Sequence, residues 1–391
     1  MDRSLEEIRR RLDEADRRIV DALAARHDLI GEVIAAKGDE SIKERDELRE
    51  HEVLARVEGH ARSAGLDPTH VAALFRDIIQ QSVDQQRSSS TGSTVTAETL
   101  RIGYQGGAGA YSYLAALQHF ADRRDSIDCR GHRTFRELID GVERDKIDYA
   151  MLPVENTTAG SINEAYDLLA HADVAAVGEE VFRVEHCLVA LEPIPVAKVR
   201  RIASHPQALA QCSEFLAGLG ECQIESYTDT AMAVAKVVRD GDPAQAAIAS
   251  REAARRHGLE VLKRGIANQR NNYTRFLVIG PRPEPCPAGV AAKTSLVLAT
   301  LHRKAALATC LNVLAEHDLN LTKLESRPLQ DTPFEYLFYL DFEGNLADEQ
   351  AQEAIEELRT HTSFLKVLGS YRASRTTVGA TATPGGDAPS G

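Results

Sequence analysis

Hydrophobic positions in the first 86 residues recur at three- and four-residue steps, with Asp, Glu and Arg between them. In the first segment these positions are Leu5, Ile8, Leu12, Ala15, Ile19 and Leu23. This spacing places the apolar side chains on one face of a helix. We therefore predict an all-helical domain over residues 1–86, followed by a flexible Ser- and Thr-rich linker over residues 87–99.

From residue 100 the pattern changes to short apolar runs that alternate with helical stretches, which is typical of an α/β domain. The candidate strands are residues 100–104, 149–154, 186–190, 202–204, 246–249 and 276–279. A proline-rich segment, residues 281–287, follows the last of them. The pattern thus predicts an α/β domain over residues 100–283.

The remaining segment, residues 290–372, has the order βαββαβ. Strand-like runs cover residues 295–301, 320–326, 334–342 and 364–371, and helical patterns cover residues 305–317 and 349–361. This order predicts an α+β unit of the ferredoxin-like kind. Residues 373–391 are rich in Thr, Gly, Ala and Pro, so we expect a disordered tail.

Length and charge narrow the class of protein. A chain of 391 residues is expected to form two to four domains. Its net charge of −13 disfavours nucleic acid as a partner, and it means that an anionic substrate needs a local cationic site. The six cysteines are scattered without a CxxC pair, and the N-terminus is charged from its second residue. We therefore expect a cytoplasmic protein without a structural zinc ion.

A polar cluster lies within residues 149–169, YAMLPVENTTAGSINEAYDLL, between an apolar run and a helical pattern. It contains Glu155, Asn156, Thr157, Thr158 and Gly160. A carboxylate, an amide and two hydroxyls beside exposed backbone N–H groups suit the binding of an oxyanion. The alternative is a well-capped helix start.

A second motif, residues 267–276, ANQRNNYTRF, favours the binding interpretation, because the two segments together resemble the signature pair of prephenate dehydratases. The three modules, in this order, resemble bifunctional chorismate mutase–prephenate dehydratases over about residues 4–372. The resemblance implies an all-α mutase module, a two-lobed α/β dehydratase domain similar to periplasmic binding proteins, and a C-terminal ACT domain. It also implies conversion of chorismate to prephenate and then to phenylpyruvate, in the phenylalanine pathway, without metal or organic cofactor.

Two cations in the helical module are placed to bracket a small dicarboxylate. Arg26 and Lys37 are eleven residues apart, which is about 16 Å along one helix face. Arg9 would lie about 42 Å from Lys37 on a continuous helix, so one chain cannot bring both to one ligand. Arg9 therefore predicts an intertwined homodimer with shared sites.

The resemblance assigns roles in the mutase module. Arg9 of a second copy, Arg26 and Arg49 would hold the carboxylates. Lys37 and Gln86 would donate to the ether oxygen of the breaking bond, and Glu50 would bind the ring hydroxyl. Asp46 and Ser82 would complete the pocket. The rearrangement is pericyclic, so catalysis reduces to orientation and charge stabilisation.

In the dehydratase module the resemblance points to Thr274 as the donor to the departing hydroxide, with Glu155 as a further proton source. Asn156, Ser204 and Gln211 would orient the substrate. Arg275 either holds a carboxylate or supports the loop. For His205 a role as general base is the weaker interpretation, and Cys212 is expected to pack. The glycine-rich segment 104–112 would shape the cleft.

In the C-terminal module Glu325, Ser326 and Arg327 match the ESRP motif of phenylalanine-binding ACT domains. Ala306 and Leu307 belong to a second motif, in which Ala305 replaces the usual glycine. The resemblance implies phenylalanine as feedback inhibitor, and the alternative is a structural dimerisation unit. Two other functions are weighed for the whole chain: a dehydratase that prefers arogenate, and a non-catalytic metabolite sensor.

Overall fold

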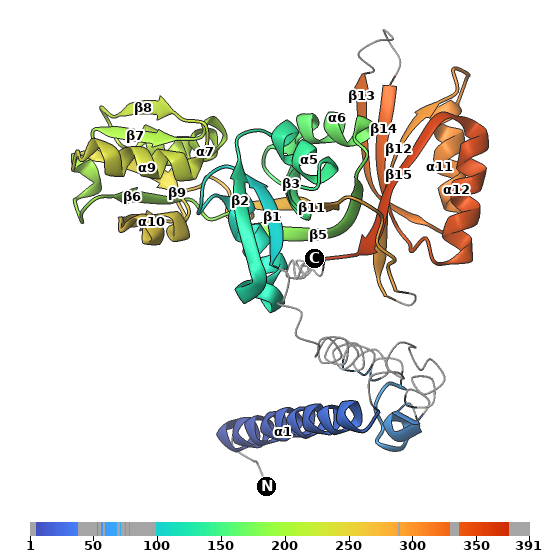
Figure 1. Cartoon of the computed structure of the whole chain (residues 1–391). Helices are drawn as coiled ribbons and strands as arrows, with labels where there is room; N and C mark the ends of the chain where they lie inside the picture. The colour runs from blue at the N-terminus through green and yellow to red at the C-terminus, as the bar shows by residue number, and fades with distance from the viewer. Residues whose placement is uncertain are drawn as a thin grey trace, which may run out of the picture. The chain divides into compact units, whose positions relative to one another are not determined.

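The computed structural model describes residues 5–37, positions 53, 56, 57, 59–68, 71, 75 and 78, and residues 99–287, 290–328 and 336–374. The chain forms two compact units, Met1–Glu98 and Thr99–Gly391. In the first unit, α1 is one continuous helix of 33 residues, Leu5–Lys37 (Figure 1). Its hydrophobic residues Leu12 and Leu23 are 57% and 41% exposed within the single chain.

The second unit begins with a lobe, here called lobe 1, built on a mixed sheet. The strand order is β2-β1-β3-β11-β5, with β4 paired to β3. The strands are β1 (Leu100–Gln105), β2 (Ile127–His132), β3 (Tyr149–Asn156), β4 (Gly160–Ser161), β5 (Ala175–Arg183) and β11 (Tyr273–Gly280). Helix α4 (Tyr111–His119) packs on one face through Tyr113 and Ala116. Helices α5 (Phe135–Glu143) and α6 (Asn163–His171) pack on the other. A short 3₁₀ helix, Ala121–Ser126, follows α4.

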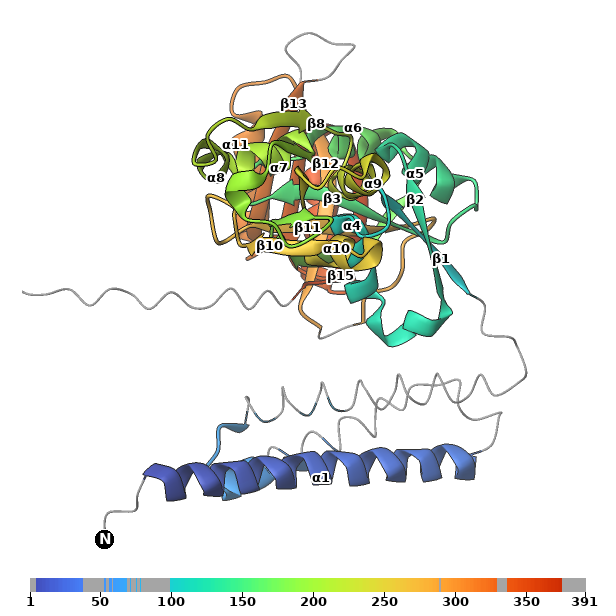
Figure 2. The same cartoon turned by 90° about the vertical axis from the view of Figure 1, so that its left-hand side faces the viewer.

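A second lobe, lobe 2, has its own five-stranded sheet in the order β10-β6-β9-β7-β8. Figure 2 views the molecule from the side of this lobe. The strands are β6 (Cys187–Ala190), β7 (Arg201–Ser204), β8 (Gln223–Ser226), β9 (Gln245–Ala249) and β10 (Glu260–Arg264). The helices are α7 (Pro206–Gln211), α8 (Ser213–Ala217), α9 (Thr230–Asp240) and α10 (Arg251–His257), with a 3₁₀ turn at Val196–Lys198. Helix α9 starts where the Asp229 carboxylate accepts from the N–H groups of Ala231 and Met232.

The chain passes between the lobes twice, from β5 to β6 and back from β10 to β11. The two crossing segments bond to each other and to their surroundings. Val184 N donates to Asn272 O over 2.8 Å, and Asn268 N donates to Gln211 O over 2.7 Å. Residues of both lobes are thereby brought together where the lobes meet.

The last part of the unit, here called the C-terminal unit, is a four-stranded antiparallel sheet with two helices. Its elements are β12 (Ala292–Thr300), α11 (Ala306–Glu316), β13 (Asn320–Pro328), β14 (Tyr336–Glu343), α12 (Glu349–His361) and β15 (Thr362–Arg372). The strand order is β13-β14-β12-β15. The predicted βαββαβ order is therefore present in the fold.

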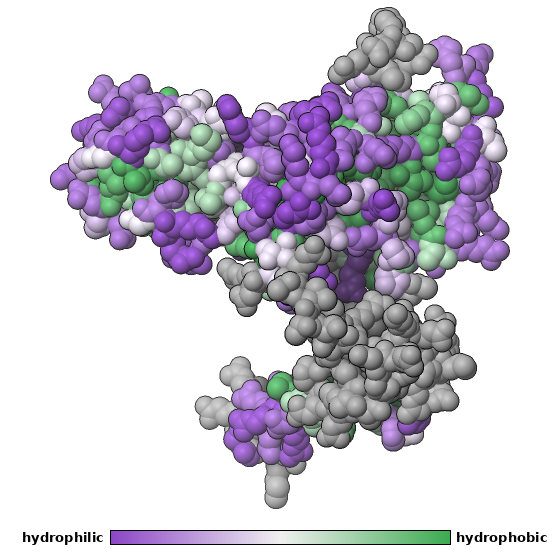
Figure 3. Space-filling view, viewed as in Figure 1, coloured by the Kyte–Doolittle hydropathy of each residue, from purple (hydrophilic) through white to green (hydrophobic). Residues whose placement is uncertain are grey.

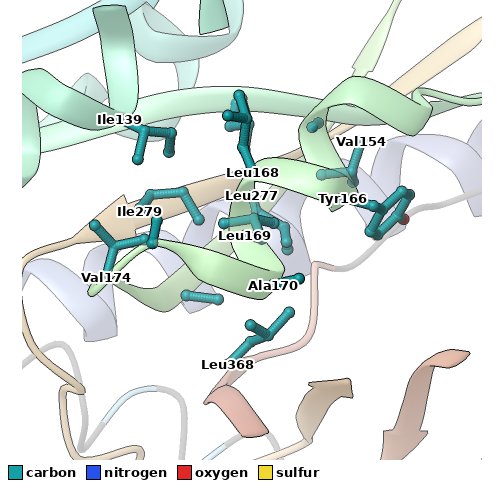
Figure 4. Packing of buried hydrophobic residues seen from close by; sticks show 14 of the residues in the cluster. Ile139, Val154, Tyr166, Leu168, Leu169, Ala170, Val174, Leu277, Ile279 and Leu368 are labelled. Carbon is teal, nitrogen blue, oxygen red and sulfur yellow. The ribbon is translucent and has the colours of Figure 1, made fainter. Parts of the chain in front are cut away.

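One hydrophobic core joins the C-terminal unit to lobe 1. Leu368 of β15 faces α6 and lies in the same buried cluster as Leu169 and Leu277 (Figure 4). The backbones approach so closely at Gly369 that an added Cβ would lie 1.9 Å from the carbonyl oxygen of Ala176. A residue with any side chain would require one of the two strands to shift.

All six strands predicted for the α/β domain are present, as β1, β3, β6, β7, β9 and β11. The prediction missed the two-residue strand β4 and also β2, β5, β8 and β10, which carry more polar residues. In β5, for example, Glu179 is buried because it is paired with cations that no local pattern reveals. None of the described helices has the length and apolar content that a membrane crossing requires.

Candidate active site

The hydroxyl of Thr274 lies beside the amide of Asn156, at the ends of two inner strands of the lobe 1 sheet. The two residues are direct partners across the antiparallel strands β11 and β3. Asn156 Nδ2 donates to Thr274 Oγ1 over 2.9 Å, and both side chains are buried. Among the hydrogen bonds of the described residues, Thr274 Oγ1 only accepts. Its own hydrogen is therefore available for a substrate oxygen.

The Asn156 side chain is held on its other side as well. Its Oδ1 atom accepts from Thr158 N and Ala159 N, each over 3.0 Å, and from Thr158 Oγ1 over 2.7 Å. Gln211 Nε2 adds a fourth contact over 3.2 Å. These contacts fix which end of the amide faces Thr274, because the oxygen is already surrounded by donors. Of the polar cluster noted in the sequence, Thr158 thus contacts the Asn156 side chain directly.

Gln211 connects this group to a buried histidine. Its Oε1 atom lies 2.7 Å from His186 Nε2 and accepts from Asn272 Nδ2 over 3.0 Å. Because Oε1 can only accept, His186 carries a proton on Nε2. His186 Nδ1 lies 2.9 Å from the hydroxyl of Tyr111. Burial lowers the pKa of His186, partly offset by the hydrogen bond to Gln211, so the ring favours its neutral form.

A cavity of about 170 Å³ opens beside this network. It is lined by Thr158, Gln207, Ala210, Gln211, Ala267, Asn268, Gln269 and Asn272. All eight residues are uncharged, which differs from the cationic site expected for an anionic substrate. Amide and hydroxyl donors are the groups this lining offers to a carboxylate.

Two predicted residues of the dehydratase site face the C-terminal unit instead of the cavity. The Glu155 carboxylate lies 3.1 Å from Lys323 Nζ of β13. The Arg275 guanidinium is bound by Glu179, Asp341 and Tyr371. Of the two roles considered for Arg275, this geometry favours support over contact with a substrate.

The other lobe 2 candidates serve the lobe itself. Ser204 is fully buried, and its hydroxyl donates to the carbonyl of Ile248 over 2.6 Å. His205 begins α7, where its Nδ1 accepts from Gln207 N over 3.2 Å. Burial, followed by the nearby Cys187 thiol, raises the pKa of Cys212 to about 12, so its thiol stays protonated. Cys212 accordingly packs, as expected.

The glycine-rich segment before α4 connects the two lobes. Gly109 lies so close to α10 that an added Cβ would be 2.8 Å from the Cα atom of Ala253. Its carbonyl accepts from the Ser250 hydroxyl over 2.8 Å. The segment therefore helps to set the position of lobe 2 relative to lobe 1.

In the helical unit, Arg26 lines a cavity of about 500 Å³ with Arg56, His60 and several hydrophobic residues. One Arg26 nitrogen donates to Ile78 O over 3.4 Å, and burial lowers the pKa of its guanidinium. Arg9 and Lys37 lie on α1, near its two ends, but their side chains are outside the described residues. The remaining mutase candidates, Asp46, Arg49, Glu50, Ser82 and Gln86, also lie outside them.

In the C-terminal unit the predicted effector residues occupy two faces of β13. Glu325 accepts from the Ser161 hydroxyl over 2.6 Å, and Arg327 binds both oxygens of Asp167. Ser326 is exposed on the opposite face. Ala306 and Leu307 begin α11.

Sequence reasoning did not single out His186, Asn272 or Tyr111 for the site. Asn272 stands two positions before Thr274 within the recognised motif, so its position was an available signal. His186 and Tyr111 come from a strand entry and a helix start far apart in the chain. Only the fold brings them together.

Comparison with known proteins places these features in a family. Residues 102–284 match the prephenate dehydratase family, and residues 8–87 match chorismate mutase type II. A bifunctional chorismate mutase/prephenate dehydratase of Enterobacter agglomerans is 36% identical over 372 residues, which are 95% of this chain and 96% of that protein. Arogenate dehydratase/prephenate dehydratase 2, a chloroplastic protein of Arabidopsis thaliana, is 36% identical over 83% of this chain and 86% of its own length.

A solved structure supports the same assignment. The prephenate dehydratase of Arthrobacter aurescens in complex with L-Phe matches with a TM-score of 0.65 and 25% identity, over 73% of this chain and 94% of that chain. Fold and matches define a metabolic enzyme that joins a helical isomerase module to a two-lobed lyase domain. The chain belongs to the family of bifunctional chorismate mutase/prephenate dehydratases. This confirms the predicted function in phenylalanine biosynthesis and sets aside a non-catalytic sensor.

Proposed function

We propose that prephenate is dehydrated at the Thr274–Asn156 pair and that chorismate is rearranged in the cavity beside Arg26. In this assignment residues 1–86 form the mutase domain, residues 100–283 the dehydratase domain and residues 290–372 an ACT domain. The observation that carries the dehydratase part is the hydrogen bond from Asn156 to Thr274. It supports a role in which the Thr274 hydroxyl acts as a donor.

The chemistry of prephenate explains why a fixed donor is useful. A ring hydroxyl leaves while the ring carboxylate is lost as carbon dioxide, and the ring becomes aromatic. Negative charge gathers on the departing oxygen, so a hydrogen-bond donor held against it lowers the barrier. Asn156 occupies one lone pair of Thr274 Oγ1 and turns the hydroxyl hydrogen away from itself. The Glu155 carboxylate, which the resemblance implies as a further proton source, is paired with Lys323 and does not line the cavity, so we assign the donor role to Thr274.

The uncharged lining of the cavity supports prephenate over arogenate. The two substrates differ at the side chain, where prephenate carries a keto group and arogenate an ammonium group. An ammonium ion is best satisfied by a carboxylate, and the eight lining residues include none. Amides such as Gln207 and Asn272 can donate to both carboxylates of prephenate. We therefore assign prephenate as the preferred substrate.

The mutase reaction is proposed to use the residues that the family resemblance assigns. Arg26 and Arg49 bind carboxylates, Lys37 and Gln86 donate to the ether oxygen, and Arg9 comes from a second copy of the chain. The unbroken length of α1 supports this sharing, because Arg9 and Lys37 lie about 42 Å apart on it. The exposure of Leu12 and Leu23 also supports a homodimer.

We further propose that the C-terminal unit binds phenylalanine and inhibits the dehydratase, through Ala306, Leu307, Glu325, Ser326 and Arg327. The βαββαβ order and the L-Phe complex of the Arthrobacter relative support this assignment. Hydrophobic residues also gather on the exposed surface of this unit (Figure 3). The exposed hydrophobic residues of its strands include Leu324, Tyr336 and Phe364. A cytoplasmic location is supported by the six cysteines, all of which are free thiols.

Two variants test whether the mutase and dehydratase reactions take place at separate sites. Lys37→Ala should abolish formation of prephenate from chorismate while prephenate supplied directly is still converted to phenylpyruvate. Thr274→Ala should show the reverse pattern, and Thr274→Ser should retain measurable dehydratase activity because the hydroxyl is kept. Equal loss of both activities in both folded variants would contradict separate sites.

A further inference from the structure

A buried cluster of charged side chains lies between lobe 1 and the C-terminal unit, with Arg275 at its centre. Arg275 Nε donates to Glu179 of β5 over 2.8 Å. Its two terminal nitrogens donate to Asp341 of β14 and, over 3.0 Å, to the Tyr371 hydroxyl of β15. One guanidinium therefore ties lobe 1 to two strands of the C-terminal unit. The Glu179 side chain is fully buried, and those of Asp341 and Arg275 are 8% and 13% exposed.

The cluster holds two cations and two carboxylates, and each charge has a partner of opposite sign. Lys293 Nζ of β12 donates to Glu179 over 2.8 Å, so Arg275 and Lys293 face the two carboxylates. Ser295 donates to Asp341 over 2.5 Å. If the C-terminal unit moved while Arg275 stayed in place, a buried carboxylate would lose its partner. A movement of the unit is therefore expected to displace Arg275 with it.

Arg275 is joined directly to the dehydratase site. It follows Thr274 on β11, and successive residues of a strand point to opposite faces of the sheet. Thr274 faces Asn156 on the site side, and Arg275 faces the C-terminal unit. A displacement of Arg275 thus changes the position of the Thr274 hydroxyl by way of a single peptide unit.

Strand β3, which pairs with β11, also has one residue at the site and its neighbour in contact with the C-terminal unit. Asn156 and Glu155 are the register partners of Thr274 and Arg275. Asn156 belongs to the site, and Glu155 is paired with Lys323 of β13 over 3.1 Å. The pairing register shifts immediately beyond, so that Phe276 lies opposite Pro153. A register shift of this kind bends the strand locally and re-aims the side chains beside it.

We propose that Arg275 and Glu155 are positioning residues that transmit the position of the C-terminal unit to Thr274 and Asn156. The inference rests on the proposed function, because it assigns the path by which phenylalanine bound to the C-terminal unit reaches the dehydratase site. Neither positioning residue needs to touch the substrate. A change of about 1 Å at Thr274 is enough to reduce turnover by about 10²-fold.

Two variants of the full-length protein test the path. Arg275→Lys keeps the positive charge but cannot bind Glu179, Asp341 and Tyr371 together. Lys323→Met removes the partner of Glu155 without changing a residue of β3 or β11. We expect both to lower kcat for prephenate by about tenfold or more with little change in KM, because orientation is lost and not binding. Phenylalanine should still bind, measured by calorimetry, but should inhibit several-fold less.

A matched control is Lys366→Met. Lys366 also joins the C-terminal unit to lobe 1, through the carbonyls of Leu169 and Ala172 at the end of α6, and the hydrogen bonds described for it reach neither β3 nor β11. This variant should keep the kcat and the phenylalanine inhibition of the parent protein. Chorismate mutase activity should be unchanged in all three variants, because residues 1–98 form a separate compact unit.

The possible results distinguish failure of the proposed path from failure of the proposed function. Unchanged kcat and unchanged inhibition in both Arg275→Lys and Lys323→Met would overturn the path while leaving the proposed site intact. An equal loss in the Lys366→Met control would likewise overturn it, since any weakened contact between the two parts would then suffice. Retention of full dehydratase activity by Thr274→Ala would instead reject the proposed function itself.

Discussion

The side-chain amide of Asn156 donates to the hydroxyl of Thr274 over 2.9 Å, although the two residues are 118 positions apart in the chain. The antiparallel pairing of β3 and β11 makes them direct neighbours. One residue belongs to each of the two motifs found in the sequence. Their contact shows how two separate segments form one site.

Asn156→Asp tests the orientation of the Thr274 hydroxyl. The carboxylate still accepts from Thr158 and Ala159, but it cannot donate to Thr274 and would attract the Thr274 hydrogen to itself. We expect dehydratase kcat to fall by about 10²-fold or more, as for loss of a fixed donor. Mutase activity measured in the same sample should be unchanged. A dehydratase rate close to that of the parent protein would contradict the assigned role.

Ala305→Gly is expected to stabilise the C-terminal unit. Ala305 has φ 60° and ψ 15°, a left-handed conformation that disfavours residues with a Cβ atom. Glycine removes this strain, so the free energy of unfolding should rise by about 1 kcal/mol. This free energy is measured by unfolding in urea. The unfolding is followed by circular dichroism, because the chain has no tryptophan whose fluorescence could report it. Ala308→Gly, inside the same helix, is the control and should lower the value by about 0.5–1 kcal/mol.

Gly369→Ala should weaken the junction between β15 and β5. The added methyl group would lie 1.9 Å from the carbonyl oxygen of Ala176, where backbone and not a flexible side chain must move. We expect a loss of about 1–3 kcal/mol, as for overpacked cores, measured by urea unfolding. Gly218→Ala is the matched control, because its nearest neighbour would be 3.4 Å away and its φ is −79°. If both variants had a similar free energy of unfolding, this would argue against a close approach of the Gly369 and Ala176 backbones.

His186 should make stability depend on pH in the mildly acidic range. Burial lowers its pKa in the folded protein, so the unfolded chain binds a proton more readily. The contribution of His186 is therefore fully present above its ordinary value of about 6.5 and is lost as the pH falls towards the lower folded pKa.

The check is to compare urea unfolding of the parent protein and His186→Gln at pH 7.5 and about 5.5, values that bracket the ordinary pKa. Glutamine keeps an amide donor for Gln211 but does not titrate, so the variant should lose less stability on acidification. His132 and His205, whose pKa values burial also lowers, remain in both proteins and leave a residual dependence. If the two proteins lost the same free energy of unfolding on acidification, His186 would be excluded as the source of the pH dependence.

Much of the fold could be predicted because the hydrophobic pattern of many segments matches the burial of these segments in the folded protein. The strands β3 and β9 are apolar runs that become buried sheet centres, and α12 was predicted with its observed limits, Glu349–His361. The strand β5 was missed because Gly178, Glu179 and Glu180 interrupt its apolar pattern. Its buried Glu179 is stabilised by Arg275 and Lys293, which come from strands far away in the sequence.

The order of the modules, the βαββαβ pattern and the two motifs that hold Asn156 and Thr274 can all be read from the amino-acid sequence. These follow from hydrophobic periodicity and from residue types that local chemistry requires. Two further features follow from the folded structure alone. Arg275 and Glu155 face the C-terminal unit, and His186 and Tyr111 join the network of Gln211. The reason is that strand register and sheet face, set by packing over the whole domain, determine where neighbouring side chains point.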